Sequence, residues 1–470
     1  MHHVRGKGRN QSALFPVSMA DLVPEDHPCR VIEAFVDTLK LAELGFANAR
    51  LGEKGRPPYD PADLLKLYLY GYLNLVRSSR SLERECHRNV EVMWLLGQLA
   101  PDHKTIANFR RYNVQALKGA SAELVRFLRS AGLVRGEWVA IDGSKFQAVA
   151  SRKSMISPAS LERVIKRAEQ RMEHYLAQLD EADQSDDVIE LDRENVQKAV
   201  EILRQRQIDA KAKLEELSRE KLSHRVESEP DARLMRGKGP GYNLQIAVDG
   251  GSGLIVAHSL TNEAADSLQL QPMAEAAAAA AGNKKLNVLA DAGYSNGVQA
   301  AALEAQGILA HAPAQRGRNS SGEGGLLDRS AFAYDPPSDT FTCPAGKEMR
   351  HYKFHRKDLL HYYRPALKDC QQCPLKSQCT IARRRTVSRH QHDDALNRME
   401  ERATTEAMRR RRCTVEHPFA TLKYQIFGHP RLLMRGLLGA AAEMAIATTV
   451  WNLKRAMSML GARDLGAKLA

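Results

Sequence analysis

The sequence is poor in the features of a secreted or membrane protein. Its 470 residues contain only 7 cysteines, an odd and sparse number that argues against a disulfide framework and favours a reducing compartment. The opening residues, HHVRGKGRNQ, lack the apolar segment of a secretory signal. The longest apolar run, Leu437 to Trp451, is shorter than the ~20 residues of a membrane helix and includes Glu443. We therefore expect a cytoplasmic protein that does not span a membrane.

What the chain has in excess is positive charge. Lys and Arg number 69 against 56 Asp and Glu, which gives a formal net charge of +13. An excess of this size favours a polyanionic partner, and nucleic acid before a membrane surface. The 43% hydrophobic and 27% charged residues are typical of a globular protein and exclude wholesale disorder. The length predicts two to four folding units.

From about residue 27 to 132 the apolar residues recur at helical spacing. Asp60 is a candidate N-cap of a buried helix, and Asp102 is a candidate cap after the break at Pro101. Two helices joined by a short turn, the second one basic, predict a helix-turn-helix, and a helical hairpin with a solvated basic face fits the pattern equally well. The candidate DNA contacts on the second helix are Lys104, Asn108, Arg110 and Arg111.

Strand patterns begin at Gly136. EWVAIDGS and KLNVLADAGY are apolar, β-branched runs that each end in Asp, and both predict central strands. Between them, GYNLQIAVDGGSGLIVAHSLTN alternates, turns at its glycines and resumes, which predicts a hairpin. With helices expected near 266–281 and 299–306 and a last strand in GILAHAP, the order is strand, strand, strand, helix, strand, helix, strand.

Two segments interrupt this unit. Residues 152–229 are rich in charge and read as free of strands, with an acidic tract, DEADQSDD, between two helices of an antiparallel, coiled-coil-like arm. Residues 315–399 begin with a Gly/Ser-rich linker, QRGRNSSGEGG, and contain four of the cysteines. The apolar stripes expected along the arm are Val164, Ala168, Met172 and Leu176 on the first helix and Val196, Val200 and Leu203 on the second.

Two aspartates are the first candidates for catalysis. If the strands before Asp142 and Asp291 are parallel neighbours, their carboxyl ends share one edge of the sheet. Two carboxylates joined by a third are an oxygen-ligand cage for two Mg²⁺ or Mn²⁺ ions, which act on phosphodiesters. A single Asp-Gly at a strand end more often caps the following turn.

Glu416 is the candidate for the third carboxylate. It lies four residues after Arg412 and seven before Lys423, so all three return to one helical face, where Arg412 and Lys423 could hold phosphate oxygens. Pro418 should kink or restart this helix, because it removes an amide and clashes with the preceding turn. An arginine run forming a solvated face is the simpler alternative.

Four cysteines suggest a structural zinc site. Cys343 is followed by Cys370-x2-Cys373-x5-Cys379, and a close pair with two outliers in a reducing compartment favours tetrahedral zinc over disulfides. Such an ion would stabilise a module too small to bury a core. Rival ligands are His390 and His392, and the remaining cysteines, Cys29, Cys86 and Cys413, are expected to be packing residues.

Several of these motifs together resemble the bacterial insertion-sequence transposases of the DDE class. The similar stretches are VAIDGSKF, GYNLQIAVD, VLADAGY, PDHKTIANFRR and Arg412-x3-Glu416-x6-Lys423 with its VEHPF core. The likeness covers most of the chain. It implies an RNase H-like catalytic core in which Asp142, Asp291 and Glu416 bind the metal ions.

The resemblance also implies a function. The chain would be a DNA transposase that uses two Mg²⁺ or Mn²⁺ ions to cut insertion-sequence ends and transfer the strands into target DNA. It would act at the nucleoid as a homodimer that joins two terminal inverted repeats. The family signature usually has Tyr three residues before its Arg, and this sequence has Arg409 there. Two alternatives stay open, namely a structure-selective nuclease of the same fold and a non-catalytic DNA-binding regulator.

The expected fold class is α/β. An RNase H-like mixed sheet with flanking helices is combined with an all-α N-terminal domain, a helical-hairpin insertion and a small cysteine-rich insertion. The expected divisions are 1–134 (N-terminal DNA-binding domain), 135–151 (first strand of the catalytic core), 152–229 (helical hairpin), 230–314 (catalytic core), 315–399 (cysteine-rich insertion) and 400–470 (C-terminal helices of the core).

Overall fold

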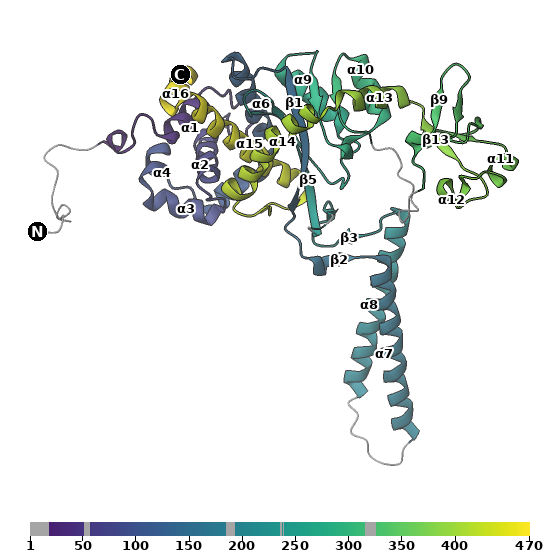
Figure 1. Cartoon of the computed structure of the whole chain (residues 1–470). Coiled ribbons are helices and arrows are strands. Elements are labelled where there is room, and N and C mark those ends of the chain that lie inside the picture. The colour runs from purple at the N-terminus through teal and green to yellow at the C-terminus, as the bar shows by residue number, and fades with distance from the viewer. Residues whose placement is uncertain (1–17, 51–56, 185–192, 236, 238, 315–325) are drawn as a thin grey trace, which may run out of the picture.

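The computed structural model describes residues 18–50, 57–184, 193–235, 237, 239–314 and 326–470 (Figure 1). The linker expected at 315–325 and the last three residues of the acidic tract, 185–187, lie outside these residues, whereas the first five residues of the tract belong to the first helix of the arm. Among the described residues, none of the helices combines the length and the apolar character needed to cross a membrane.

The described part of the N-terminal region contains helices and connecting turns but no strand, in agreement with the prediction. Asp60 accepts a hydrogen bond from the Ala62 amide at 2.8 Å, and Asp102 accepts one from the Lys104 amide at 2.9 Å, so both predicted caps are confirmed. The helices bury Tyr68 and other apolar side chains against one another. They are α1 (Pro28–Asp37), α2 (Pro61–Leu73), α3 (Ser79–Arg88), α4 (Val90–Leu95), α5 (His103–Tyr112) and α6 (Val114–Ser130).

A mixed sheet forms the centre of the molecule. Strand β1 pairs antiparallel with β5 and parallel with β7, which pairs parallel with β8, and β5 also pairs with β6 and β4. The predicted hairpin is β5–β6. The strands are β1 (Trp138–Gln147), β4 (Arg233–Met235), β5 (Gly239–Asp249), β6 (Ile255–Thr261), β7 (Asn287–Leu289) and β8 (Leu309–His311).

Helices cover both faces of this sheet because its strands are apolar on both sides. Val139 and Ile141 face the core formed with α9, α10 and α13, whereas Ala140 and Phe146 face the core formed with α14 and α15. This arrangement confirms the predicted α/β, RNase H-like fold. The covering helices are α9 (Leu270–Ala281), α10 (Gly297–Ala305), α13 (Asp393–Arg402), α14 (Thr405–Ala420), α15 (Gly436–Leu460) and α16 (Ala462–Leu469).

Helix α15 joins the N-terminal helices to the sheet. Its Glu443 is fully buried, and a carboxylate in such a place must be paired. Arg77 lies 3.4 Å from the Glu443 carboxylate, the Tyr72 hydroxyl donates to it at 3.2 Å, and the Leu433 amide donates at 2.7 Å. The longest apolar run of the sequence therefore forms a buried helix in the core of a globular protein.

The arm is a helical hairpin that projects from the body (Figure 1). Its helices are α7 (Pro158–Gln184) and α8 (Arg193–Arg219). The predicted stripe on α7 is wrong at its ends, because Val164 and Leu176 are 44% and 50% exposed, while Leu161, Ile165 and Ala168 follow the buried side. The segment is also not free of strands, since β2 (Met155–Ile156) and β3 (Arg225–Val226) pair at its base.

The cysteine-rich segment contains a five-stranded antiparallel sheet that the sequence analysis did not predict. It has a small core of its own in which Phe341 and Tyr363 are buried, so the expectation of a module too small to bury a core is wrong. Its elements are β9 (Ala333–Asp335), β10 (Thr340–Thr342), β11 (Glu348–His355), β12 (Leu360–Arg364), β13 (Val387–His390), α11 (Leu367–Gln371) and α12 (Lys376–Cys379).

Candidate active site

The two predicted aspartates lie on neighbouring parallel strands. Ala140 of β1 pairs with Leu289 of β7, so Asp142 and Asp291 each follow the paired residues by two positions. The expectation that both strands end at Asp is wrong for β1, which continues to Gln147 in register with β5. Asp142 therefore lies within a strand, whereas Asp291 begins a turn and accepts a hydrogen bond from the Gly293 amide at 2.8 Å.

A guanidinium group from α14 lies between the two carboxylates. The Nη2 atom of Arg411 is 2.8 Å from an oxygen of Asp142 and 3.5 Å from an oxygen of Asp291. Arg411 shares its helical face with the buried Ala407 and Val415, four residues before and after it, and this face packs on β1. The sequence analysis missed this residue.

The predicted phosphate-binding residue Arg412 is turned away from this face. Its side chain is exposed, as expected for a position about 100° further around the helix. Lys423 follows in a π-helical turn (Thr421–Ile426), where its Nζ lies 5.7 Å from the centre of the Phe419 ring. The predicted restart at Pro418 comes later than expected, because α14 continues to Ala420 before the π-helical turn begins.

Glu416, the predicted third carboxylate, is exposed on α14. Within the described residues, it does not join Asp142 and Asp291 in a group of ligand atoms that all lie within 4.8 Å of one another. The helix that carries it packs against both β1 and β7, the two strands that position the aspartates.

A third acidic residue, Asp266, lies near Asp142 and was not anticipated. Its carboxylate accepts hydrogen bonds from Lys145 at 3.2 Å and from Asn243 and Gln245 at 2.7 Å. Gln245 also accepts the Tyr294 hydroxyl, which ties the turn after Asp291 to β5. The sequence pattern places Asp266 at the start of the helix expected near 266–281, but α9 begins at Leu270, so Asp266 lies in the connection between β6 and α9.

The carboxylates influence one another electrostatically. Burial raises the pKa of Asp142 to about 6, and Asp291 and Asp266 add to this effect, whereas Arg411 opposes it. Burial also raises the pKa of Tyr294, with further contributions from the same aspartates. The site thus gathers carboxylates around Arg411, and its oxygen donors are those that Mg²⁺ prefers.

The four cysteines of the insertion line one small pocket. Burial raises the pKa of the Cys379 thiol, Arg385 opposes this, and Cys370, Cys343 and Cys373 raise the pKa further, which places all four thiols near one another. In the described part of the chain, no three of their sulfur atoms lie within 4.8 Å of one another. The rival ligand His390 lies elsewhere and accepts a hydrogen bond from the His392 amide at 3.1 Å.

The predicted DNA-contacting face of α5 needs one correction. Lys104, Asn108 and Arg111 are exposed, but Arg110 is buried and donates a hydrogen bond to the Tyr72 hydroxyl at 3.1 Å. Arg110 lies on the same helical face as the buried Ile106, one turn away, so it cannot reach DNA. The exposed residues form a basic strip along one side of the helix.

Cys413 also departs from its prediction. Its side chain is exposed on α14, whereas Cys29 and Cys86 are buried packing residues as expected.

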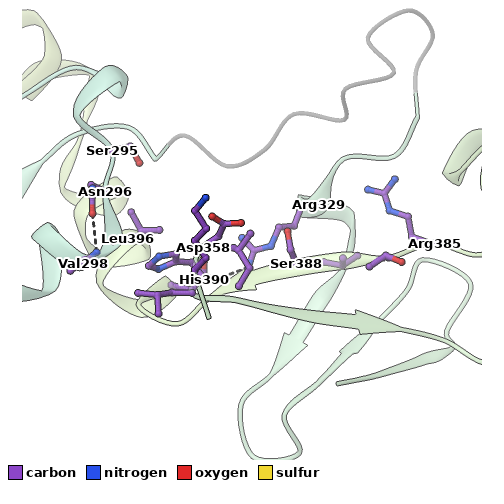
Figure 2. A pocket seen from close by; sticks show the side chains of 16 residues that line it. Ser295, Asn296, Val298, Arg329, Asp358, Arg385, Ser388, His390 and Leu396 are labelled. Atoms are coloured by element: carbon purple, nitrogen blue, oxygen red, sulfur yellow. Dashed lines mark hydrogen bonds and ion pairs between the residues drawn. The ribbon is translucent and has the colours of Figure 1, made fainter. Parts of the chain in front are cut away.

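A pocket of about 420 Å³ adjoins the turn that follows Asp291 (Figure 2). Residues 295–298 line one side, and the insertion lines the other. Its Arg329 pairs with Asp393 at 2.7 Å, and its Arg385 donates to the backbone carbonyl groups of Cys379 and Leu327. Arg385 thus links parts of the insertion to one another, whereas Arg329 links the insertion to the first residue of α13, a helix that covers the sheet.

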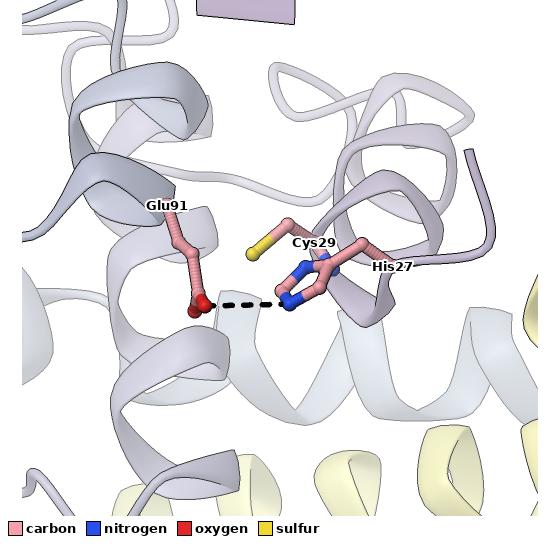
Figure 3. A group of neighbouring side chains, drawn as sticks. All are labelled: His27, Cys29 and Glu91. Atoms are coloured by element: carbon pink, nitrogen blue, oxygen red, sulfur yellow. Dashed lines mark hydrogen bonds and ion pairs between the residues drawn. The ribbon is translucent and has the colours of Figure 1, made fainter. Parts of the chain in front are cut away.

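A second group of metal-ligating side chain types lies in the N-terminal helices (Figure 3). His27 caps α1 by accepting the Cys29 amide on Nδ1, so its proton is on Nε2, which lies 3.4 Å from Glu91. Burial raises the pKa of the Cys29 thiol to about 12. The cap that His27 provides to α1 and its contact with Glu91 give this group a structural role in the N-terminal helices.

Comparison with known families gives two matches. A family model described as a transposase domain (DUF772) matches residues 17–112, and one described as a transposase DDE domain matches residues 342–457. The first covers the helices up to α5, and the second covers α14 with Glu416. Searches of curated proteins and of solved structures found no match to this chain.

Proposed function

The chain belongs to the insertion-sequence transposases of the DDE class, and on this premise we propose that it cuts DNA at the ends of its element and joins the freed strand to target DNA. The observation that carries the proposal is the convergence of Asp142 and Asp291 on one nitrogen of Arg411. Two carboxylates that contact the same guanidinium nitrogen, with Glu416 on the covering helix, are a donor set that fits divalent cations.

In this mechanism Asp142, Asp291 and Glu416 would hold the cations. Two bound divalent cations would supply the positive charge that stabilises the attacking and leaving oxygens of an in-line displacement. Arg412 and Lys423 would contact phosphate oxygens, and Lys104, Asn108 and Arg111 would position the duplex through its backbone and base edges. We further propose that two copies of the chain act together, because joining two ends requires two sites.

We also propose a structural zinc ion at Cys343, Cys370, Cys373 and Cys379. The shared pocket and the mutual influence of the thiols on the pKa of Cys379 support this proposal. Binding would deprotonate the thiols and draw the sulfur atoms together.

The test is Mn²⁺-dependent cleavage of a duplex that contains the end of the element. Asp142→Asn, Asp291→Asn and Glu416→Gln should each lower the rate about a thousandfold, since a lost ligand removes several kcal/mol of transition-state stabilisation. Asp266→Asn is the matched control and should stay within tenfold of the parent rate, because Lys145, Asn243 and Gln245 already bind its carboxylate. Retained cleavage by folded Asp142→Asn protein would overturn the assignment.

Strand transfer is a second measurement, and it distinguishes the proposed function from a nuclease and from a non-catalytic regulator. A structure-selective nuclease would cut branched DNA without joining strands, and a non-catalytic regulator would be indifferent to all three ligand substitutions. Strand transfer into a target plasmid, with loss in the Asp142→Asn protein, is the result expected of the proposed function.

A further inference from the structure

Arg411 occupies an unusual position for a cation in this protein. Its side chain is only 12% exposed, and its guanidinium approaches two carboxylates that come from different strands. Its guanidinium pairs with both aspartates, and it comes from the helix that also carries Glu416.

The guanidinium is held by charge more than by hydrogen bonds. Its contact with Asp291 is 3.5 Å long, and within the described residues its buried Nε has no hydrogen-bond partner. Arg402 shows the contrast, because its Nε donates to the Ala310 carbonyl at 3.0 Å and its Nη2 contacts Glu304 at 2.7 Å. A buried donor without a partner costs free energy, so little besides the two aspartates favours this position of Arg411.

A divalent cation that bridged Asp142 and Asp291 would need the same carboxylate oxygens. A guanidinium and a metal ion cannot both occupy the space between them, because each needs contact with those oxygens and the two positive charges repel. Binding of one must therefore exclude the other.

We propose that Arg411 is an internal counter-ion that competes with the catalytic cations, so that loading the site requires its guanidinium to leave the two aspartates. This inference rests on the proposed function, since it assumes that Asp142 and Asp291 are metal ligands. It assigns Arg411 the role of a positioning residue that keeps the carboxylates together and sets the metal concentration at which the site fills.

Two adjacent arginines provide a matched pair for the test. Arg411→Gln removes the competing charge, whereas Arg412→Gln removes an equal charge from the exposed side of the same helix. Mn²⁺ binding to the full-length protein without DNA is measured by electron paramagnetic resonance of free Mn²⁺. We expect Arg411→Gln to bind Mn²⁺ about tenfold more tightly than the parent and Arg412→Gln to stay within twofold of it. Unchanged or weaker binding by folded Arg411→Gln would overturn the inference.

A second measurement is thermal unfolding with and without Mn²⁺. The Arg411→Gln protein should unfold at a lower temperature than the parent without metal, because its carboxylates lose their counter-ion, and Mn²⁺ should raise its Tm by more than that of the parent. If Arg411→Gln does not fold, Arg411→Met takes its place, because it removes the charge and keeps a long, unbranched side chain. Its Mn²⁺ affinity should also rise about tenfold, and a parent-like value would contradict the inference.

The outcome also separates the two proposals. Loss of Mn²⁺ binding in Asp142→Asn with no change in Arg411→Gln would leave the proposed function intact and refute only the competition. Full Mn²⁺ binding by Asp142→Asn would refute both.

Discussion

At the scale of single residues, Arg110 and Arg111 are neighbours on α5 with different expected roles. Arg110 should stabilise the fold, and Arg111 should contact DNA. The Arg110 guanidinium is buried between Tyr72 and the Tyr68 ring, whose centre lies 5.2 Å away, and Arg111 is exposed. Arg110→Ala should lower the free energy of unfolding by about 2–3 kcal/mol, since it removes a buried charged hydrogen bond. Urea unfolding measures this loss.

Arg111→Ala serves as the control for that prediction. It should leave the free energy of unfolding within about 0.5 kcal/mol of the parent but weaken DNA binding, with the slope of log K against log salt reduced by about 1. Equal loss of stability in both proteins would show that the two side chains do not differ as described.

Some residues of the site could be predicted from the sequence, and others could not. Asp142 and Asp291 could be placed together because parallel neighbouring strands bring equivalent positions to one edge of a sheet. Arg411 could not be distinguished from Arg412, because the phase of a helix within a run of arginines depends on what it packs against. Asp266 could not be assigned to the site, since its position follows from the path of a loop. The role of Glu416 stays a prediction.

At the scale of elements, the zinc proposal concerns how α11 and α12 are held to the sheet of the insertion. The protein as purified should contain about one zinc ion per chain by elemental analysis, and Cys370→Ser with Cys373→Ser should lose it, because a tetrahedral site needs all four thiolates. Cys413→Ser is the matched control, since it removes an exposed cysteine on α14. Folded, metal-free parent protein with four reactive thiols in the insertion would contradict the proposal.

Helices and strands whose apolar residues recur at a regular spacing could be predicted from the sequence, and those without such spacing could not. The helices of the N-terminal region and the β5–β6 hairpin follow from regular spacing of buried residues. The strands of the insertion are short, and β11 exposes much of its length to solvent, so no alternation distinguishes them from loops. The predicted buried side of α7 was partly wrong because apolar residues occur on both the buried and the exposed side of this helix.

At the scale of the whole molecule, charge is unevenly distributed. Residues 158–219 contain 15 Asp and Glu against 11 Lys and Arg, so the arm is acidic while the whole chain carries +13. Many of its charges also pair locally, as Glu169 does with Lys211 and Glu194 with Lys198. The arm is therefore a poor candidate for the surface that holds DNA phosphates.

Removal of the arm tests this distribution. Replacing 158–219 by a short Gly/Ser linker should leave the body folded, because β2 and β3 already close the base of the arm. Affinity for random duplex DNA should be equal or slightly higher, with an unchanged salt slope, as measured by fluorescence anisotropy over a salt series. A shallower salt slope would show instead that cations of the arm contact DNA.

The position of α15 between the N-terminal helices and the sheet has a consequence for folding during synthesis. Because Glu443 receives Tyr72 and Arg77 from more than 360 residues earlier, the N-terminal helices and the sheet cannot complete their docking until α15 has been synthesised. Growing chains, and fragments truncated before this helix, would expose both apolar surfaces that it covers. Assembly of the core therefore depends on the synthesis of this late helix.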